Sequence, residues 1–278
     1  MPNQTLIIGC GYIGLPLALY LQSQGHEITG WVHSEVSAES LKAQPFHRLV
    51  VGSVASPGVW DQALPAYDVV IHCASSRRGG VAAYEEVFLR GVAMMNAHQP
   101  RARRLFVSST SVYGQTKGEV VTEESESEPV TDTGRILRVA ELAALVEGAM
   151  VVRSAGIYGP ERGVLWEKFR RGEAVIEGDG LRWINQIHQR DLVGALAHLI
   201  SHGEPGQIYN ACDDMPVTQL DFYTWCAEQL HKPLPPHGAV NPNRKRGLTN
   251  KRVSNAKLRG TGWVPGYPSF REGLAAAG

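Results

Sequence analysis

Cysteine is scarce in this sequence, and no cysteine lies close to another. The 278 residues contain four, at Cys10, Cys73, Cys212 and Cys226, with no C-x-x-C spacing and no histidine at metal-ligand spacing. Disulfide frameworks and zinc sites depend on clustered cysteines. The sequence therefore predicts reduced, mostly buried thiols and no metal centre.

An excess of charge and a long apolar run are also missing. Twenty-seven Lys and Arg residues balance 27 Asp and Glu residues, so a general role in binding nucleic acid is not expected. No apolar run approaches the roughly 20 residues that span a bilayer. No basic region precedes the first apolar run, as a signal peptide would require. We expect a cytoplasmic protein whose partner is a small molecule and neither a nucleic acid nor a membrane.

The most informative feature that is present is a glycine-rich turn near the start. Gly9, Gly11 and Gly14 form G-x-G-x-x-G after a short apolar run, with a helical pattern at 15–24 and a second strand pattern at 26–32. The first glycine permits a tight turn, the second lets the backbone approach a pyrophosphate, and the third lets the helix pack close to the strand. The helix N-terminus then favours the phosphates. This unit predicts dinucleotide binding.

The end of the second strand bears on the choice between NAD and NADP. An NAD site usually places Asp or Glu there to bond the ribose hydroxyls. Here the strand ends in Trp31-Val32-His33-Ser34, and the first acid, Glu35, comes slightly late. His33 and Ser34 could donate hydrogen bonds to a 2′-phosphate, which a carboxylate would repel. We favour NADP, with NAD as the alternative; His33 and Ser34 could also be ordinary solvated turn residues.

Alternating strand and helix patterns continue along the chain. Strand patterns follow at 48–54, 68–75, 104–114, 149–160 and 206–214, and helical patterns at 81–97, 136–147 and 191–201. Such alternation predicts an α/β fold with a doubly wound parallel sheet of the Rossmann, NAD(P)-binding type. We expect residues 1–160 to form the nucleotide-binding domain. Residues 161–278 should form a smaller C-terminal substrate lobe, with one late strand at about 206–212 returning to the sheet.

Ligands of doubly wound sheets bind beyond the carboxyl ends of the strands. The glycine-rich turn and the residues at these ends are therefore the expected cofactor contacts. They are Gly9, Gly11, Tyr12, Ile13, Gly14, His33, Ser34, Ser53, Val54, Cys73, Ala74, Ser75, Ser108, Ser154 and Gly156.

The last third of the chain contains a locally basic segment. Residues 243–259 include seven Lys or Arg and no acid, namely Arg244, Lys245, Arg246, Lys251, Arg252, Lys257 and Arg259. In a chain without net charge, such a segment could guide an anionic substrate such as a phosphate, a nucleotide or a carboxylate. A solvated basic face is the plainer interpretation.

Taken together, these motifs resemble the extended and atypical side of the short-chain dehydrogenase/reductase superfamily, the NAD-dependent epimerase/dehydratase family. The matching segments are the glycine-rich turn at 9–14, "HCAS" at 72–75, "SSTSVYG" at 108–114, "GIYGP" at 156–160, "IHQRDL" at 187–192 and "GWVPGYPSFREGL" at 262–274. They follow the family order and cover nearly the whole chain. "SSTSVYG" followed by "PVTDTGR" is most similar to the small YeeZ-like atypical group.

The resemblance implies roles where residues match. Ser109 matches the family's catalytic Ser/Thr, which hydrogen-bonds the reacting hydroxyl or carbonyl. Tyr158, with Gly159, resembles the turn that flanks the nicotinamide, and His188 with Asp191 matches a helix-entry motif near the substrate lobe. Arg182 falls where nucleotide-sugar enzymes often place a phosphate-binding arginine. The expected substrate contacts are Ser109, Ser111, Arg182, Asn185 and Arg252.

One departure from the family affects catalysis. The family carries Tyr-x-x-x-Lys about where this chain reads "PVTDTGRILRVAE", which has neither residue. Taking Glu141 as the Glu that often follows the Lys by four places Thr133 at the Tyr position and Leu137 at the Lys position. A threonine hydroxyl near its free pKa cannot replace the tyrosine as acid and base at neutral pH. The Asp-Glu of sugar 4,6-dehydratases is also replaced, by Thr110-Ser111, which argues against dehydration.

Three interpretations remain open. In the first, the chain is an NADP-dependent reductase or epimerase that uses another proton donor; the catalytic candidates are Ser109, Tyr113, Thr133 and His188, with Tyr158 as a further donor. In the second, it is a catalytically weak or inactive NADP-binding module that senses redox state. The third is non-redox chemistry on the same fold, which nothing in the sequence supports. The apolar helix at 136–147 is compatible with a homodimer, and equally with a helix buried in a monomer.

Overall fold

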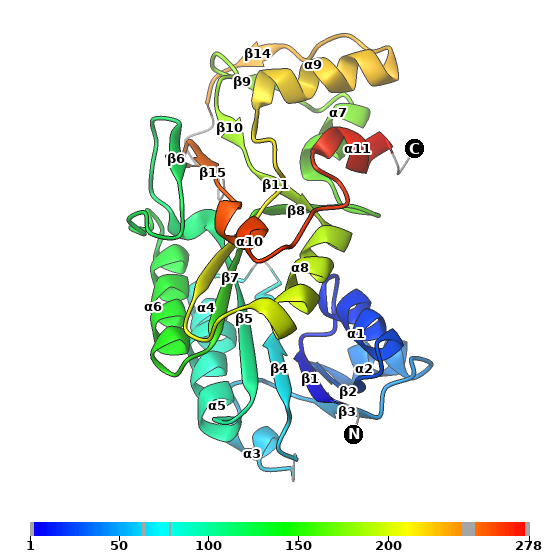
Figure 1. Cartoon of the computed structure of the whole chain (residues 1–278). Coiled ribbons are helices and arrows are strands. Elements are labelled where there is room, and N and C mark those ends of the chain that lie inside the picture. Colours follow the sequence, from blue (N-terminus) through cyan, green and yellow to red (C-terminus); the bar gives the residue numbers. More distant parts are fainter. Residues whose placement is uncertain (1–2, 63–64, 78, 241–247, 276–278) are drawn as a thin grey trace. The chain divides into compact units, whose positions relative to one another are not determined.

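The computed structural model describes residues 3–62, 65–77, 79–240 and 248–275. Contacts within the chain divide it into two compact units (Figure 1). The first unit is formed by Met1–Val112, Pro129–Arg153 and Val193–Tyr209, and the second by Tyr113–Glu128, Ser154–Leu192 and Asn210–Gly278. The two units therefore alternate along the sequence. A single boundary at residue 160 stays a prediction.

A seven-stranded parallel sheet forms the centre of the first unit, which confirms the predicted doubly wound fold. Its order is β12-β7-β5-β4-β1-β2-β3. The strands are β1 (Gln4–Ile8), β2 (Glu27–Val32), β3 (Arg48–Val51), β4 (Val69–His72), β5 (Arg103–Ser109), β7 (Met150–Ser154) and β12 (Ile208–Ala211). Ile8 at the end of β1 is in register with Trp31 and His72. The carboxyl ends of the central strands therefore meet at one edge of the sheet.

The strands are apolar because helices cover the sheet on both faces. The helical segments whose residues fall mainly in the first unit are α1 (Gly14–Ser23), α2 (Glu35–Leu41), α3 (Pro57–Trp60), α4 (Val81–Tyr84), the π-helical η1 (Glu85–Arg90), α5 (Gly91–His98), the 3₁₀ segment η2 (Thr110–Val112), α6 (Asp132–Val146) and α8 (Gln189–His202). The helix expected at 81–97 is thus α-helical at both ends and π-helical in the middle. α6 begins earlier than expected because Thr131 caps it, accepting a hydrogen bond from the Gly134 N–H at 3.1 Å.

The second unit contains short paired strands and helices. Its elements are β6 (Glu119–Val121), β8 (Gly156–Tyr158), α7 (Val164–Arg170), β9 (Ile176–Glu177), β10 (Trp183–Ile184), β11 (Gln186–His188), β13 (Val217–Thr218), α9 (Gln219–Leu230), β14 (His237–Gly238), β15 (Lys251–Val253), α10 (Ala256–Gly260) and α11 (Phe270–Ala275). The pairs are β6 with β15, β8 with β11, β9 with β14 and β10 with β13. Phe169, Phe222 and Phe270 belong to its buried core. No helix among the described residues is both long and apolar enough to cross a membrane.

Two predicted strands are longer in sequence than in the structure. The strand expected at 149–160 is wrong as a single element, because β7 ends at Ser154 and β8 pairs instead with β11 in the second unit. The strand expected at 104–114 stops at Ser109, where η2 begins. In both segments a short polar stretch interrupts the apolar pattern where the strand ends, and the pattern alone does not reveal where a strand changes its pairing partner.

Candidate functional site

The glycine-rich turn between β1 and α1 has the geometry of a phosphate-binding turn. A Cβ on Gly9, whose φ is +95°, would lie 2.3 Å from Ala74 Cα, and a Cβ on Gly14 would lie 2.1 Å from the Gly9 carbonyl oxygen. Packing therefore excludes a side chain at both positions. A Cβ on Gly11 would meet nothing within 4 Å. Glycine at position 11 is thus not required by the protein's own packing, and it leaves the open backbone surface that a pyrophosphate needs.

Hydrogen bonds fix the shape of this turn. The N–H groups of Gly9 and Cys10 both donate to the Trp31 carbonyl, at 2.9 and 3.1 Å, which ties the turn to β2. The N-cap residue of α1, Ile13, provides no side-chain cap. A bound anion can therefore take the place of the cap at this helix end. Tyr12 is half-buried and Ile13 buried, so their expected contribution comes from the backbone. These features fit a dinucleotide.

The residues expected beside the ribose lie at the ends of β2 and β3. His33 is exposed, and Ser34 caps α2, its Oγ accepting from the Ser37 N–H at 3.4 Å. Ser53 Oγ donates to Glu86 Oε1 at 2.5 Å. Val54 is buried in contact range of Gly91, where an added Cβ would come within 2.9 Å of it. Val54 therefore serves packing, whereas His33 is open to a ligand.

Three expected cofactor residues follow β4. Cys73 Sγ donates to the Gly9 carbonyl at 3.5 Å, and Ala74 lies directly against Gly9. Ser75 is exposed. Burial raises the pKa of the Cys73 thiol, so it stays protonated and acts as a wall of the turn. The loop after β4 therefore packs against the glycine-rich turn.

The two serines at the end of β5 have different environments. Ser108 is buried, and its hydroxyl donates to Glu141 Oε1 at 2.6 Å. That geometry favours a structural role over cofactor contact. Ser109 is half-buried, and its Oγ accepts the Ser111 N–H at 3.1 Å. In this bond the Ser109 oxygen is the acceptor, so its own hydroxyl proton is not used, while Ser111 is exposed.

Glu141 is the centre of a buried charged cluster. Arg153 donates to it through Nε at 3.0 Å and through Nη2 at 2.8 Å, and Arg138 donates through Nη1 at 3.0 Å. Glu141 and Arg153 are both fully buried. The positions aligned with the missing pair lie on the same helix: Leu137 is buried in the core, and Thr133 is half-buried with its hydroxyl 3.3 Å from Thr131 Oγ1.

The tyrosines considered as proton donors belong to the second unit. Tyr113 is fully buried, and its hydroxyl donates to Asn210 Oδ1 at 2.9 Å. Tyr158 is also buried; its hydroxyl donates to the Ser269 carbonyl at 3.2 Å, and burial raises its pKa. Both hydroxyl protons are therefore committed within the unit. This geometry favours structural roles for both tyrosines, including at the position where Tyr158 was expected to contact the nicotinamide.

His188 is enclosed by aromatic rings. Its ring centroid lies 4.1 Å from that of Tyr267 and 5.2 Å from that of Tyr158, and its Nδ1 accepts the Arg190 N–H at 3.2 Å. Burial, assisted by the charge of Arg190, lowers the pKa of His188 to about 4. His188 is therefore neutral at pH 7 and has no proton to give as an imidazolium. Asp191 accepts two backbone N–H groups, from Gly266 at 2.7 Å and Tyr267 at 3.0 Å.

The expected substrate residues are partly used within the second unit. Asn185 pins β15, because its Nδ2 donates to the Lys251 carbonyl at 2.9 Å and its Oδ1 accepts the Val253 N–H at 2.7 Å. Arg252 lies over the Trp183 ring at 5.2 Å and donates through Nε to the Gly118 carbonyl at 3.0 Å.

The remaining expected contacts of this unit are also engaged in part. Arg182 Nε lies 3.8 Å from Glu177 Oε2. Ser154 Oγ donates to the Ala155 carbonyl at 3.0 Å, and Gly156 is exposed, its N–H donating to the Asn185 carbonyl at 3.1 Å.

Sequence reasoning did not single out Lys251, which the structure makes conspicuous. Lys251 is 5% exposed, and its Nζ donates to the Tyr113 carbonyl at 3.1 Å and to Thr249 Oγ1 at 2.6 Å. Within the described residues it has no carboxylate partner. Burial lowers its pKa to about 8. The only sequence signal was its place in the basic segment, of which Arg244, Lys245 and Arg246 lie outside the described residues.

Comparison with known proteins gives the family of the chain. The model of the NAD dependent epimerase/dehydratase family matches residues 5–212. Protein YeeZ of Escherichia coli K12 is 30% identical over 264 residues, covering 91% of this chain and 93% of that protein. A functionally unknown conserved protein from Silicibacter pomeroyi superposes with a TM-score of 0.75 at 27% identity, covering 99% of this chain and 97% of the other.

A more distant solved structure has the same fold. A dTDP-glucose 4,6-dehydratase from Streptomyces venezuelae with NAD bound superposes with a TM-score of 0.81 at 21% identity, covering 98% of this chain and 95% of that one. The family match spans most of the chain and includes the glycine-rich turn, the loop after β4 and Ser109. The chain therefore belongs to the NAD-dependent epimerase/dehydratase family.

Proposed function

We propose that the chain is an NAD(P)-dependent oxidoreductase or epimerase that acts on a small anionic substrate, resembling a sugar nucleotide or a carboxylate. The observation that carries this proposal is the open backbone surface at Gly11, set between two glycines that packing requires. Such a turn has space for a pyrophosphate and no other structural reason for its central glycine. Family membership supports the same conclusion.

The first unit carries the groups that the proposed activity uses on the cofactor side. When bound, the nicotinamide ring supplies a hydride donor or acceptor. This unit would hold the phosphates at the glycine-rich turn and use the oriented Ser109 hydroxyl to polarise a substrate oxygen. A role in binding an anion is proposed separately for Lys251 and Arg252 of the second unit.

The charge of Lys251 supports an anionic substrate. A buried ammonium without a carboxylate partner is costly in the free protein, and a substrate phosphate or carboxylate would compensate it. The Lys251 ammonium has three N–H donors, and its hydrogen bonds to the Tyr113 carbonyl and Thr249 Oγ1 use two of them. The sugar-nucleotide dehydratase among the structural relatives has an anionic substrate by its name. This points to the same chemical class here.

A binding module without turnover is the second candidate function. It is favoured by Thr133 and Leu137 at the positions aligned with the family's Tyr and Lys, and by the internal hydrogen bonds of Tyr113 and His188. In that case the chain would bind NADP and report redox state to a partner. The intact glycine-rich turn is common to both functions, so the two differ only in whether hydride is transferred.

A pair of matched glycine variants tests the cofactor site. Gly11→Val places a side chain in the proposed pyrophosphate space, whereas Gly58→Val in α3 places one where an added Cβ likewise meets nothing within 4 Å. We expect Gly11→Val to weaken NADPH and NADH binding by at least about 100-fold, since it blocks the close approach of the phosphates. Gly58→Val should bind as the wild type does, and both variants should keep the wild-type melting temperature. Unchanged NADPH and NADH binding in Gly11→Val would contradict the proposed cofactor site.

Hydride transfer separates the enzyme from the module. The protein is incubated with NADPH deuterated at the reactive nicotinamide carbon and a small-molecule cell extract, and metabolites that gain deuterium are sought by mass spectrometry. A labelled product that disappears in Ser109→Ala, while NADPH binding persists, supports the reductase. For an epimerase that recycles its hydride, the same extract is searched for interconverted isomers. If neither a labelled product nor an interconverted isomer is found although NADPH binds, the result supports the binding module.

We also propose a homodimer formed through α6. Val139, Leu142 and Val146 of this helix are 50%, 47% and 83% exposed and are spaced three or four residues apart, so they share one face. An exposed apolar stripe of this kind marks an interaction surface. A Leu142→Glu variant should shift the mass in light scattering from dimer to monomer.

The free thiols and balanced charge agree with a cytoplasmic location.

A further inference from the structure

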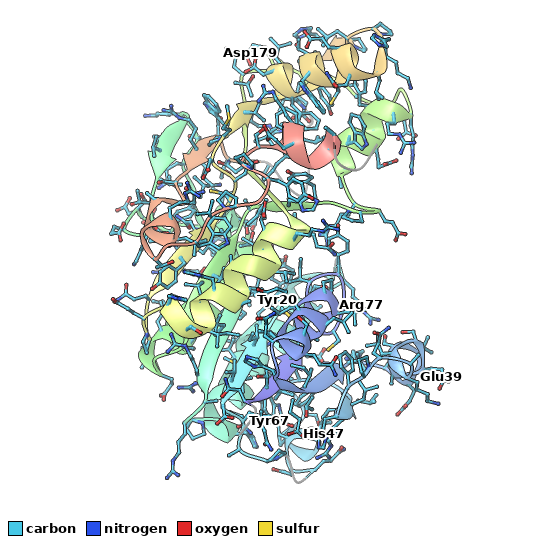
Figure 2. All side chains as sticks on the ribbon, turned by 45° about the vertical axis from the view of Figure 1, so that its right-hand side comes forward. Tyr20, Glu39, His47, Tyr67, Arg77 and Asp179 are labelled. Carbon is cyan, nitrogen blue, oxygen red and sulfur yellow. The ribbon has the colours of Figure 1, made fainter. Side chains whose placement is uncertain are left out.

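Arg77 lies in the loop that follows β4, and its side chain reaches the first turn of α2. Its Nη2 donates a hydrogen bond to Ser37 Oγ at 3.2 Å, although 40 residues separate the two in sequence. Arg77 is exposed and is labelled in Figure 2. It therefore bridges the segments that follow β4 and β2, the two strands that flank β1 in the sheet.

The hydrogen bond from Arg77 continues into a second hydroxyl. Ser34 Oγ lies 3.1 Å from Ser37 Oγ and accepts the Ser37 N–H at 3.4 Å. One hydroxyl proton joins the two serines, so the other is left for an acceptor outside the protein. His33, which precedes them, is exposed. The end of β2 thus carries a guanidinium and hydroxyl donors together.

The backbone at Arg77 also departs from the usual conformation. Its φ is +49°, in the left-handed region that residues other than glycine seldom adopt. Arg77 therefore combines an uncommon backbone conformation with a side-chain hydrogen bond to Ser37, as expected of a side chain that the fold holds in place.

We propose that Arg77, together with Ser34 and Ser37, binds the 2′-phosphate of NADPH and so selects NADP over NAD. In doubly wound folds the adenosine ribose lies at the end of the second strand, where an arginine accommodates a 2′-phosphate. This chain has no arginine at that strand end, and Arg77 brings one from the loop after β4 instead. A guanidinium can form two parallel hydrogen bonds with phosphate oxygens. The inference rests on the proposed cofactor site at Gly11.

The test compares two arginine variants. Arg77→Ala and Arg101→Ala each remove one exposed positive charge from the first unit. Arg101 precedes β5 and so lies at the amino end of the parallel sheet, away from the strand ends that bind ligands. Calorimetry gives dissociation constants for NADPH, NADH, 2′,5′-ADP and 5′-AMP, and melting temperatures confirm that all proteins are folded. The adenosine fragments make the result independent of turnover.

We expect Arg77→Ala to bind NADPH and 2′,5′-ADP roughly 10-fold to 100-fold more weakly, the range for losing a charge-assisted hydrogen bond. Its affinity for NADH and 5′-AMP should stay within about twofold, and Arg101→Ala should match the wild type. The affinity of Arg77→Lys for NADPH and 2′,5′-ADP should lie between those of the wild type and Arg77→Ala. Lysine keeps the positive charge but cannot form two parallel hydrogen bonds with a phosphate.

Other outcomes separate this inference from the proposed function. If Arg77→Ala keeps the wild-type preference for NADPH over NADH, the proposed role of Arg77 is wrong. The proposed cofactor site at Gly11 is not contradicted by that result. An equal loss in Arg101→Ala would reduce the effect to general electrostatics and also overturn it. Wild-type preference for NADH would overturn the selection of NADP and point to Glu35 as a ribose ligand. Failure of every nucleotide to bind would remove the proposed cofactor site itself.

Discussion

Arg153 in the first unit and Lys251 in the second are both buried cations, and their surroundings differ. Arg153 forms two hydrogen bonds with the fully buried Glu141, at 3.0 and 2.8 Å, and Glu141 also accepts from Ser108 and Arg138. Lys251 donates to two neutral oxygens, the Tyr113 carbonyl and Thr249 Oγ1. Among the described residues, a carboxylate therefore compensates the charge of Arg153, whereas none compensates the charge of Lys251.

Under the proposed function, this difference corresponds to different purposes of the two residues. A compensated buried pair links the elements that carry its members, here β5, α6 and β7, and breaking it is costly. An uncompensated buried cation is a cost that the free protein carries, and a bound anion can relieve that cost. Structural charge and functional charge can therefore be distinguished by the partner, even when burial is the same.

Removing the partner of Arg153 should have the largest effect on stability. We expect Glu141→Gln to lower the free energy of unfolding by about 3–5 kcal/mol, because it removes the carboxylate that accepts two hydrogen bonds from the buried Arg153. The measurement is urea unfolding at pH 7, with Glu85→Gln as the control. Glu85 is exposed at the start of η1, and its substitution should change stability little. Equal effects in the two variants would contradict the structural role of the cluster.

The second comparison concerns the pH dependence of Lys251. Its pKa is about 8 in the folded protein against 10.5 for a free lysine. Between pH 8 and 10.5 the unfolded chain therefore binds more protons, so wild-type stability should rise with pH relative to Lys251→Met, by up to about 3 kcal/mol. Below pH 8 the difference should be constant, and Lys251→Met should be at least as stable as the wild type. Loss of stability in this variant at pH 7 would mean that the charge is already compensated.

A comparable effect at lower pH is expected at His188. Its pKa is about 4 in the folded protein and 6.5 when free. The unfolded chain binds more protons between these values, so wild-type stability should fall as pH falls from 6.5 to 4, by up to about 3 kcal/mol relative to His188→Gln. Parallel curves for the two proteins between pH 4 and 7 would show that His188 is exposed to solvent and open to protonation.

The fold and the glycine-rich turn could be predicted because their requirements are local. Gly9 and Gly14 are needed by contacts that arise within one βα unit and its neighbouring strand. The lengths of the strands were predicted less well, since β5 stops at Ser109 and the strand pattern had been extended to Gly114. A strand ends where its pairing ends, and pairing depends on residues far away in the chain.

The catalytic candidates show the same limit more sharply. Ser108 and Ser109 are equivalent in the sequence, and only the position of Glu141, 33 residues later, makes one of them internal. Tyr113 has suitable chemistry, but Asn210, 97 residues later, binds its hydroxyl. Lys251 was one of seven basic residues, and burial alone distinguishes it. Residue type predicts what a group can do, whereas its partners decide whether it is free to do it.

The alternation of the two units along the sequence has a consequence for how proteins of this kind can diverge. Each unit is assembled from three separate stretches of chain. A cut at any single position would leave at least one of the units incomplete, so the second unit cannot be exchanged by recombination as one continuous segment. If the second unit binds the substrate, as proposed, new specificity would arise by substitution and loop insertion within the stretches 113–128, 154–192 and 210–278. A lineage built in this way should keep its cofactor turn while these three stretches vary together.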